Sequence, residues 1–257
     1  MSALSVDLAT ARALEEHALN ASGAFQSLLY DGWLLGFRAG PTKRLRCVNP
    51  FYASTLPLAQ KVEHCVNFYR DVALPAIFRM VPFSQPPDLD AWLDHAGWPR
   101  FDRTKVLHVD LASVRAPAAP TDCVELMDVA AWQAPVAELM EVAPETVAKL
   151  VEHARSYPLP HSGALVRRDG RVVACGLVKM DSSHAGLFAV HTAKALRGQG
   201  LGKAIVSALL AEAVDKGARR AYLQVTADNA PALALYERYG FVSAYEYWYR
   251  ARDDEQQ

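Results

Sequence analysis

Three glycines at alternate positions separate a segment typical of a strand from a segment typical of a long helix. Residues 185–192 are mostly apolar, and the apolar residues of 201–216 recur at helical spacing. The run between them, over residues 197–203, reads RGQGLGK. Glycine adopts backbone conformations that other residues avoid, and a helix N-terminus presents unpaired N–H groups. The pattern therefore predicts an α/β domain with an anion site, suited to a pyrophosphate, where the helix begins.

The spacing of these glycines excludes two common phosphate-binding motifs. The dinucleotide fingerprint requires G-x-G-x-x-G, whereas the glycines here stand at positions 198, 200 and 202. The Walker sequence requires Ser or Thr after its lysine, and Lys203 is followed by Ala204. The pattern that fits is R-x-x-G-x-G, beginning at Arg197.

Segments typical of strands and of helices alternate through both halves of the chain. In the second half we expect strands over 123–127, 163–168, 171–180, 185–192, 221–226 and 241–249, and helices over 130–141, 145–156, 201–216 and 230–239. In the first half we expect strands over 32–38, 45–48, 76–81 and 104–111, and helices over 10–20, 58–73 and 90–96. From 32–38 onward, the first half repeats the order in which the second half ends.

The register of these segments predicts an internal duplication. The helices expected at 58–73 and 201–216 begin 143 residues apart, and the dipeptides Gly97-Trp98 and Gly240-Phe241 have the same offset. We therefore expect one domain over 1–111 and a second over 122–257. The Ala- and Pro-rich segment 112–121 is expected to be the linker between them.

Three segments of the second half resemble a known family. Residues 190–202, VHTAKALRGQGLG, resemble the acetyl-CoA signature of the GNAT N-acetyltransferase superfamily. Residues 229–241, NAPALALYERYGF, resemble that family's N-x-x-A-x-x-x-Y-x-x-x-G-F segment, and YLQV at 222–225 is also similar to it. The resemblance covers roughly residues 122 to 250. It implies an α/β fold of two GNAT-like mixed β-sheet units flanked by helices, of which the C-terminal unit is complete.

The resemblance also implies site residues. The pantetheine arm of acetyl-CoA would lie along the strand that ends with Val190, His191 and Thr192. Asn229 would cap the next helix and reach the cofactor. Tyr236 would be the general acid that protonates the departing thiolate. The pyrophosphate would be bound by backbone N–H groups of Arg197, Gly198, Gln199, Gly200, Leu201, Gly202 and Lys203.

The general base stays unassigned. Members of this family often place a carboxylate on the strand before the glycine turn, and residues 185–192 contain none. His184 begins that strand, and a histidine with a pKa near neutrality is a candidate base. A structural role for His184 and a water relay are the alternatives.

The first half lacks the features of a cofactor site. The segment that aligns with the glycine turn, ASTLPL at 53–58, contains no glycine, and Pro57 has no N–H to donate. Leu93 stands at the position equivalent to Tyr236. We expect a degenerate copy that binds no cofactor and shapes the substrate pocket.

The composition of the chain limits the classes of molecule that we expect it to bind. The 27 Lys and Arg against 28 Asp and Glu leave a net charge of −1, which disfavours general nucleic-acid binding. Neither a signal peptide nor a membrane-spanning apolar run is evident, and the four cysteines show no metal-ligand spacing. We expect a cytoplasmic monomer or homodimer with no metal and no membrane partner.

The expected activity is transfer of the acetyl group from acetyl-CoA to a primary amine of a small molecule or peptide. Direct attack in a ternary complex is favoured, because no nucleophile for a covalent intermediate is evident and Cys175 lies on an apolar segment. Two alternatives stay open. One is an acyl-CoA-binding regulatory protein without turnover, and the other is a transferase that uses a larger acyl or aminoacyl donor. The sequence does not select the acceptor amine.

Overall fold

The structure, a computed structural model, describes residues 4–22, 26–40, 42–114 and 123–252, which form two compact units. The first unit comprises the described residues of Met1–Arg12, Ala24–Val106 and Ser243–Gln257. The second comprises those of Ala13–Gly23 and Leu107–Val242. Each unit is therefore assembled from segments that are distant in the sequence.

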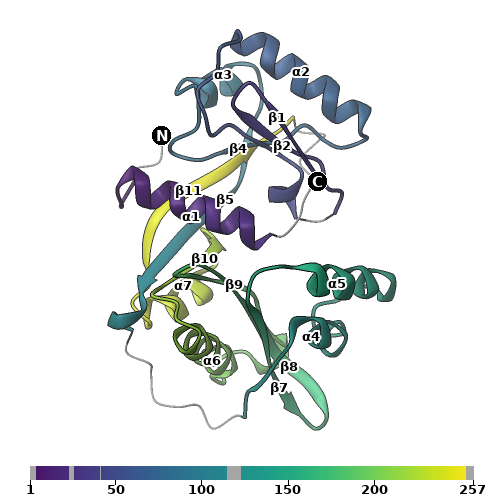
Figure 1. The fold of residues 1–257 in the computed structure, drawn as a ribbon, viewed down its shortest axis with the longest axis vertical. Helices are drawn as coiled ribbons and strands as arrows, with labels where there is room; N and C mark the ends of the chain where they lie inside the picture. Colours follow the sequence, from purple (N-terminus) through teal and green to yellow (C-terminus); the bar gives the residue numbers. More distant parts are fainter. Residues whose placement is uncertain (1–3, 23–25, 41, 115–122, 253–257) are drawn as a thin grey trace. The chain divides into compact units, whose positions relative to one another are not determined.

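The helices and strands follow one another along the chain as shown in Figure 1. The first part contains α1 (Leu8–Ala21), β1 (Ser27–Tyr30), β2 (Trp33–Gly36), η1 (Lys43–Leu45), β3 (Val48–Asn49), α2 (Leu58–Asp71), β4 (Phe78–Met80), α3 (Leu89–His95), β5 (Arg100–Asp110) and η2 (Leu111–Ser113). The second part contains β6 (Glu125–Met127), α4 (Val129–Val136), α5 (Pro144–Ser156), β7 (His161–Arg168), β8 (Arg171–Asp181), β9 (His184–Thr192), η3 (Lys194–Leu196), α6 (Leu201–Asp215), β10 (Arg220–Thr226), α7 (Ala230–Glu237) and β11 (Val242–Arg250).

In the second unit a mixed sheet lies between helices (Figure 1). Its strands are ordered β5-β10-β9-β8-β7-β6, with β9 and β10 parallel and the pairs from β9 to β6 antiparallel. Side chains alternate between the faces of a strand. On β8, Ala174 and Val178 therefore join the core under α6, whereas Cys175 and Leu177 pack with α4. The sheet is thus buried on both faces.

In the first unit the strands are ordered β1-β2-β3-β4-β11-β5. Trp33, Phe78 and Trp248 lie in the core with the apolar faces of α2 and α3. Strands β1 and β2 are joined by Asp31 and Gly32, both with positive φ, at 41° and 85°. These angles suit a two-residue hairpin turn.

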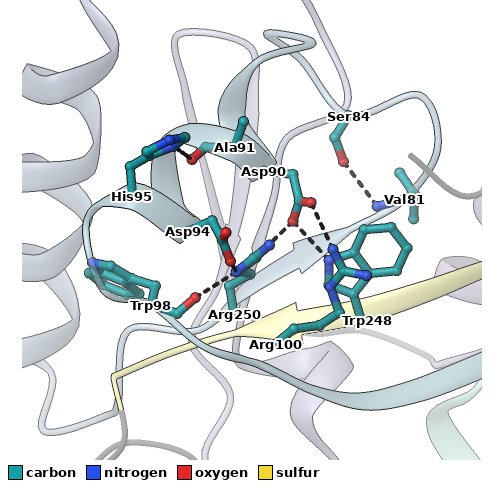
Figure 2. A network of polar contacts seen from close by, with 10 residues as sticks. All are labelled: Val81, Ser84, Asp90, Ala91, Asp94, His95, Trp98, Arg100, Trp248 and Arg250. Carbon is teal, nitrogen blue, oxygen red and sulfur yellow. Dashed lines mark hydrogen bonds and ion pairs between the residues drawn. The ribbon is translucent and has the colours of Figure 1, made fainter.

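A buried arginine links α3 to the last strand (Figure 2). Arg250 is 2% exposed, and its Nε donates to Oδ1 of Asp90 at 2.7 Å. Its Nη1 donates to Asp94 and, at 2.8 Å, to the carbonyl of Trp98. Nε1 of Trp248 also donates to Oδ1 of Asp90, at 2.8 Å. Burial raises the pKa of Asp90, but the bonds from Arg250 and Trp248 outweigh it and hold that pKa below its usual value.

Most of the expected elements are confirmed. The order from β6 to β11 is the one expected from the sequence, and the mixed α/β fold with flanking helices is confirmed. Strand β1 was not expected, and β5 begins at Arg100 rather than at residue 104. Of the linker expected over 112–121, residues 115–121 lie outside the described residues, and residues 112–113 belong to η2.

The compact units do not coincide with the two expected sequence copies. Strand β11, at the end of the second copy, belongs to the first unit and pairs with β4. Strand β5, at the end of the first copy, contributes residues 107–110 to the second unit, where it neighbours β10. The predicted boundaries at residues 111 and 122 therefore describe the two sequence copies rather than the compact units, and they stay a prediction.

Candidate active site

Parallel strands β9 and β10 pair along only part of their length. The register runs from His184 opposite Arg220 to Leu187 opposite Leu223 and then stops. Strand β9 nevertheless continues to Thr192, and its last five residues are half-buried whereas the first four are buried. Backbone donors and acceptors of residues 188–192 on the β10 side are therefore left for a ligand or water.

An irregularity in β9 lies at the end of this pairing. Leu177 of β8 faces Phe188, but Cys175 faces His191, so β9 has one residue more than its partner over this stretch. Ala189, within it, has a φ of +51°. A β-bulge of this kind bends the strand and increases its local twist. It directs the end of β9 away from its regular course where the sheet opens.

The glycine turn follows directly after β9 and η3. Gly198 and Gly200 have φ of +81° and +85°, and space is open where a Cβ would stand on either residue. Gly200 is the N-cap residue of α6, so no side chain of the cap covers the first N–H groups of that helix. Leu201 is 1% exposed and belongs to the core cluster, so its side chain packs inward rather than toward a ligand. The open turn and the uncapped helix N-terminus have the geometry that the predicted anion site of main-chain groups requires.

The expected cofactor residues of β9 and of the turn lie close together. Nε of Arg197 donates to the carbonyl of Thr192 at 3.4 Å. A Cβ on Gly202 would stand 3.7 Å from Oγ1 of Thr192 and 3.4 Å from Cδ2 of Leu235 on α7. Val190 packs against the core cluster that contains Leu201. His191 and Lys203 are half-buried near the same segments.

Side chains stabilise both ends of helix α7, and the one that follows its C-terminal end attaches it to α6. Oδ1 of Asn229 accepts from the N–H of Ala232 at 3.2 Å, which confirms its capping position. The hydroxyl of Tyr239 donates to the carbonyl of Lys203 at 2.8 Å and lies 2.8 Å from Oγ of Ser207. Sequence reasoning did not identify Tyr239, whose only signal was its place between Tyr236 and Gly240.

Tyr236 lies on α7 with its ring in the core. The residue is 7% exposed, and the ring packs edge-on against Phe241 at 5.8 Å between centroids. None of the described residues forms a hydrogen bond with its hydroxyl. Burial raises its pKa to about 12. The phenol is therefore protonated at neutral pH, as a proton donor must be.

His184 lies at the closed end of the strand pair, away from this opening. It is 9% exposed, and its ring stacks on His17 at 4.1 Å between centroids. Nδ1 of His17 in turn lies 3.0 Å from Oδ2 of Asp181. Burial, and then the nearby His17 and Arg220, lower the pKa of His184 to about 4. Four residues along a strand span about 13 Å, so His184 is a poor candidate for a base acting near Phe188.

The lowered pKa of His184 predicts a loss of stability in mild acid. Between pH 6.5 and 4 the unfolded chain binds a proton at this position and the folded chain does not, so stability falls as pH falls. From pH 7 to pH 5 the contribution is about 2 kcal/mol. Urea unfolding at pH 7 and at pH 5 should show that His184→Asn loses less free energy of unfolding in acid than the unmodified chain does. The control is His95→Asn at an exposed position, and an equal acid loss in both variants would contradict the assignment.

Residues 4–22, 26–40, 42–114 and 123–252 contain no group of three or more His, Cys, Asp or Glu side chains arranged to hold a metal ion. Over the same ranges, no helix combines the length and the apolar character needed to cross a bilayer.

Comparison with known sequences identifies relatives of the second half. The profile of the Acetyltransferase (GNAT) family matches residues 125–241. The uncharacterized N-acetyltransferase Mb2688 of Mycobacterium bovis is 33% identical over 130 residues, which are 47% of this chain and 83% of that protein. Mycothiol acetyltransferase of Corynebacterium aurimucosum is 43% identical over 68 residues, 26% of this chain. The chain spans only 22% of that relative's length.

Comparison with solved structures extends over nearly the whole chain. A GCN5-related N-acetyltransferase from Kribbella flavida superimposes with a TM-score of 0.66. The match covers 95% of each chain at 18% sequence identity. At this identity the similarity concerns the fold.

Proposed function

Because the chain belongs to the GNAT family of acetyltransferases, we propose that it moves the acetyl group of acetyl-CoA to a primary amine of a small molecule or peptide. The observation that carries this proposal is the opening between β9 and β10 next to the glycine turn of α6. Unpaired strand groups suit an amide-containing arm, and the uncapped helix N-terminus suits a pyrophosphate.

The donor site is assigned to residues of the second half. Val190, His191 and Thr192 would bind the pantetheine arm, and Asn229 would position the start of α7. When bound, acetyl-CoA supplies an acetyl thioester. The backbone N–H groups that would hold the pyrophosphate belong to Arg197, Gly198, Gln199, Gly200, Leu201, Gly202 and Lys203.

Transfer would proceed by direct attack of the amine. The amine nitrogen forms a bond to the acetyl carbon as the carbon–sulfur bond breaks, and the hydroxyl of Tyr236 donates its proton to the departing sulfur. Burial raises the pKa of the Cys175 thiol to about 12, which makes it a poor nucleophile and supports the route without a covalent intermediate. The position of His184 leaves a water relay as the route for the proton lost by the amine.

In the proposed first copy, a carboxylate of the chain itself occupies the position equivalent to the anion site of the second copy. The loop before α2 presents the N–H groups of Thr55 and Leu56, which both donate to the carboxylate of Asp31 at 3.0 Å. The ammonium of Lys61, fully buried, lies 3.2 Å from the same carboxylate. Helices α2 and α6 begin 143 residues apart, at Leu58 and Leu201. These contacts support a single donor site and the proposed duplication, while the role of the first copy in acceptor binding stays a prediction.

Turnover tests the proposed function directly. Release of free thiol from acetyl-CoA should be measured with a panel of amino acids, polyamines, aminoglycosides and peptides, and acetyl-CoA binding should be measured by calorimetry. Turnover with at least one amine is expected. Binding without turnover of any amine would favour a regulatory acyl-CoA-binding protein, and preferred binding of a longer acyl or an aminoacyl donor would favour the other alternative.

Tyr236→Phe is expected to lower kcat by about 10- to 100-fold, because the variant lacks the proton donor, and to change the KM for acetyl-CoA little. Since the pKa of Tyr236 is about 12, its loss should not alter the pH dependence of kcat between pH 6 and 9. A matched control is Tyr157→Phe, since burial also raises the pKa of Tyr157 to about 12. That control should keep kcat within about twofold. Unchanged kcat in Tyr236→Phe would remove the residue as the acid.

A further inference from the structure

The side chain of Gln199 links the glycine turn to the hairpin between β7 and β8. Nη1 of Arg168 donates to Oε1 of Gln199 at 2.7 Å. Arg168 ends β7, is half-buried, and pairs with Arg171 across the two-residue turn Asp169-Gly170. The hairpin thus places a guanidinium beside the turn, although the two residues are 31 positions apart in the sequence.

Other cations gather around the same turn. Lys194 and Arg197 precede the glycines, and Lys203 follows them on the first turn of α6. Arg167, the neighbour of Arg168, is engaged elsewhere through an ion pair with Glu125 at 3.3 Å. Arg168, Lys194, Arg197 and Lys203 thus bring several positive charges to the turn, and this favours a ligand that carries more than one phosphate.

We propose that Arg168 binds the 3′-phosphate on the ribose of acetyl-CoA and that Gln199 positions its guanidinium; this rests on the proposed function. In the proposed function the arm of the donor would lie along β9 and the pyrophosphate on the turn. The ribose phosphate would then lie beside the turn, where Gln199 is exposed and bound by Arg168. A guanidinium has five donors in a planar fork, so its bond to Gln199 is compatible with a further bond to a phosphate oxygen. The bond to Gln199 restricts the guanidinium to this side of the turn.

The test compares two donors that differ only in this phosphate, acetyl-CoA and acetyl-3′-dephospho-CoA, by calorimetry on the full chain. Arg168→Gln should raise the Kd of acetyl-CoA about tenfold, since a charge-assisted bond is lost. The Kd of the dephospho donor should change less than about twofold. An equal rise for both donors would place Arg168 at the pyrophosphate and overturn the assignment, as would no change for either.

A second variant tests the role of Gln199. Gln199→Leu removes the acceptor that holds the guanidinium, and it should raise the Kd of acetyl-CoA about threefold with a smaller effect on the dephospho donor. A merely structural role of Gln199 would weaken both donors equally. Arg155→Gln on α5 makes the same change in net charge at an exposed position and should leave both affinities unchanged. An unmodified chain that binds neither donor contradicts the proposed function, whereas normal binding by Arg168→Gln contradicts this inference alone.

Discussion

Replacing Gly200 with proline is expected to raise the Kd of acetyl-CoA more than about 100-fold, beyond what calorimetry detects at ordinary concentrations. Gly200 has a φ of +85°, whereas the ring of proline requires about −65°. The substitution also removes an N–H group from the anion site. Both effects act at the N-cap residue of α6, where the proposed pyrophosphate site depends on the direction of successive N–H groups.

Two glycine-to-alanine variants separate the loss of the site from a loss of stability. Gly200→Ala keeps the N–H and costs about 1–2 kcal/mol of backbone strain, so it should weaken binding far less than proline. Gly217→Ala places the same strain at the other end of α6, where φ is +88°, and should leave the Kd unchanged. Circular dichroism checks that each variant is folded. A folded Gly200→Pro with unchanged affinity would defeat the assignment of the turn.

Replacing Arg250 with methionine is expected to lower the free energy of unfolding by about 3–5 kcal/mol. The change leaves the partly buried carboxylate of Asp90 without its cation and the carbonyl of Trp98 without its donor. It also removes the bond between Arg250 and Asp94. Within the described residues, helix α3 would keep its apolar packing and the bond from Trp248 as its attachment to β11.

Urea unfolding followed by tryptophan fluorescence measures this loss. Arg252→Met is the matched control, because Arg252 is exposed and its guanidinium lies over the ring of Trp98 at 5.2 Å. That control should change stability by less than about 0.5 kcal/mol. Adding Asp90→Asn to Arg250→Met removes the uncompensated charge and should recover part of the loss. Equal stability of Arg250→Met and the unmodified chain would show that the network contributes nothing.

Local signals explain which elements could be predicted. Helices α2 and α6 begin at Leu58 and Leu201, as expected, because apolar spacing and the preceding proline or glycine are read within a few residues. Asn229 was predicted as a cap for the same reason, since a cap concerns only the first turn of its helix. Strand β1 was missed although Asp31-Gly32 is a hairpin signal, because β1 is short and largely exposed.

Other features of the site depend on partners far away in the sequence. The bulge at Ala189 arises from a slip between β8 and β9, and nothing in the composition of β9 marks it. His184 was a plausible base from its residue type, but burial and its contact with His17 lower its pKa. Arg168 belongs to no sequence motif, and it lies beside Gln199 because the β7–β8 hairpin brings the two residues together.

The sequence by itself determined the order of elements from β6 to β11, the glycine turn with its positive φ angles, and the family to which the second half belongs. These features depend on residues within one or two turns of each other, where steric preference and helix capping act. Only the tertiary structure decided that β11 completes the first unit and that Arg250 meets Asp90, 160 residues away. It also decided where β9 and β10 separate. Such pairings depend on packing and on the burial of charge over the whole fold, so a local sequence pattern does not predict them.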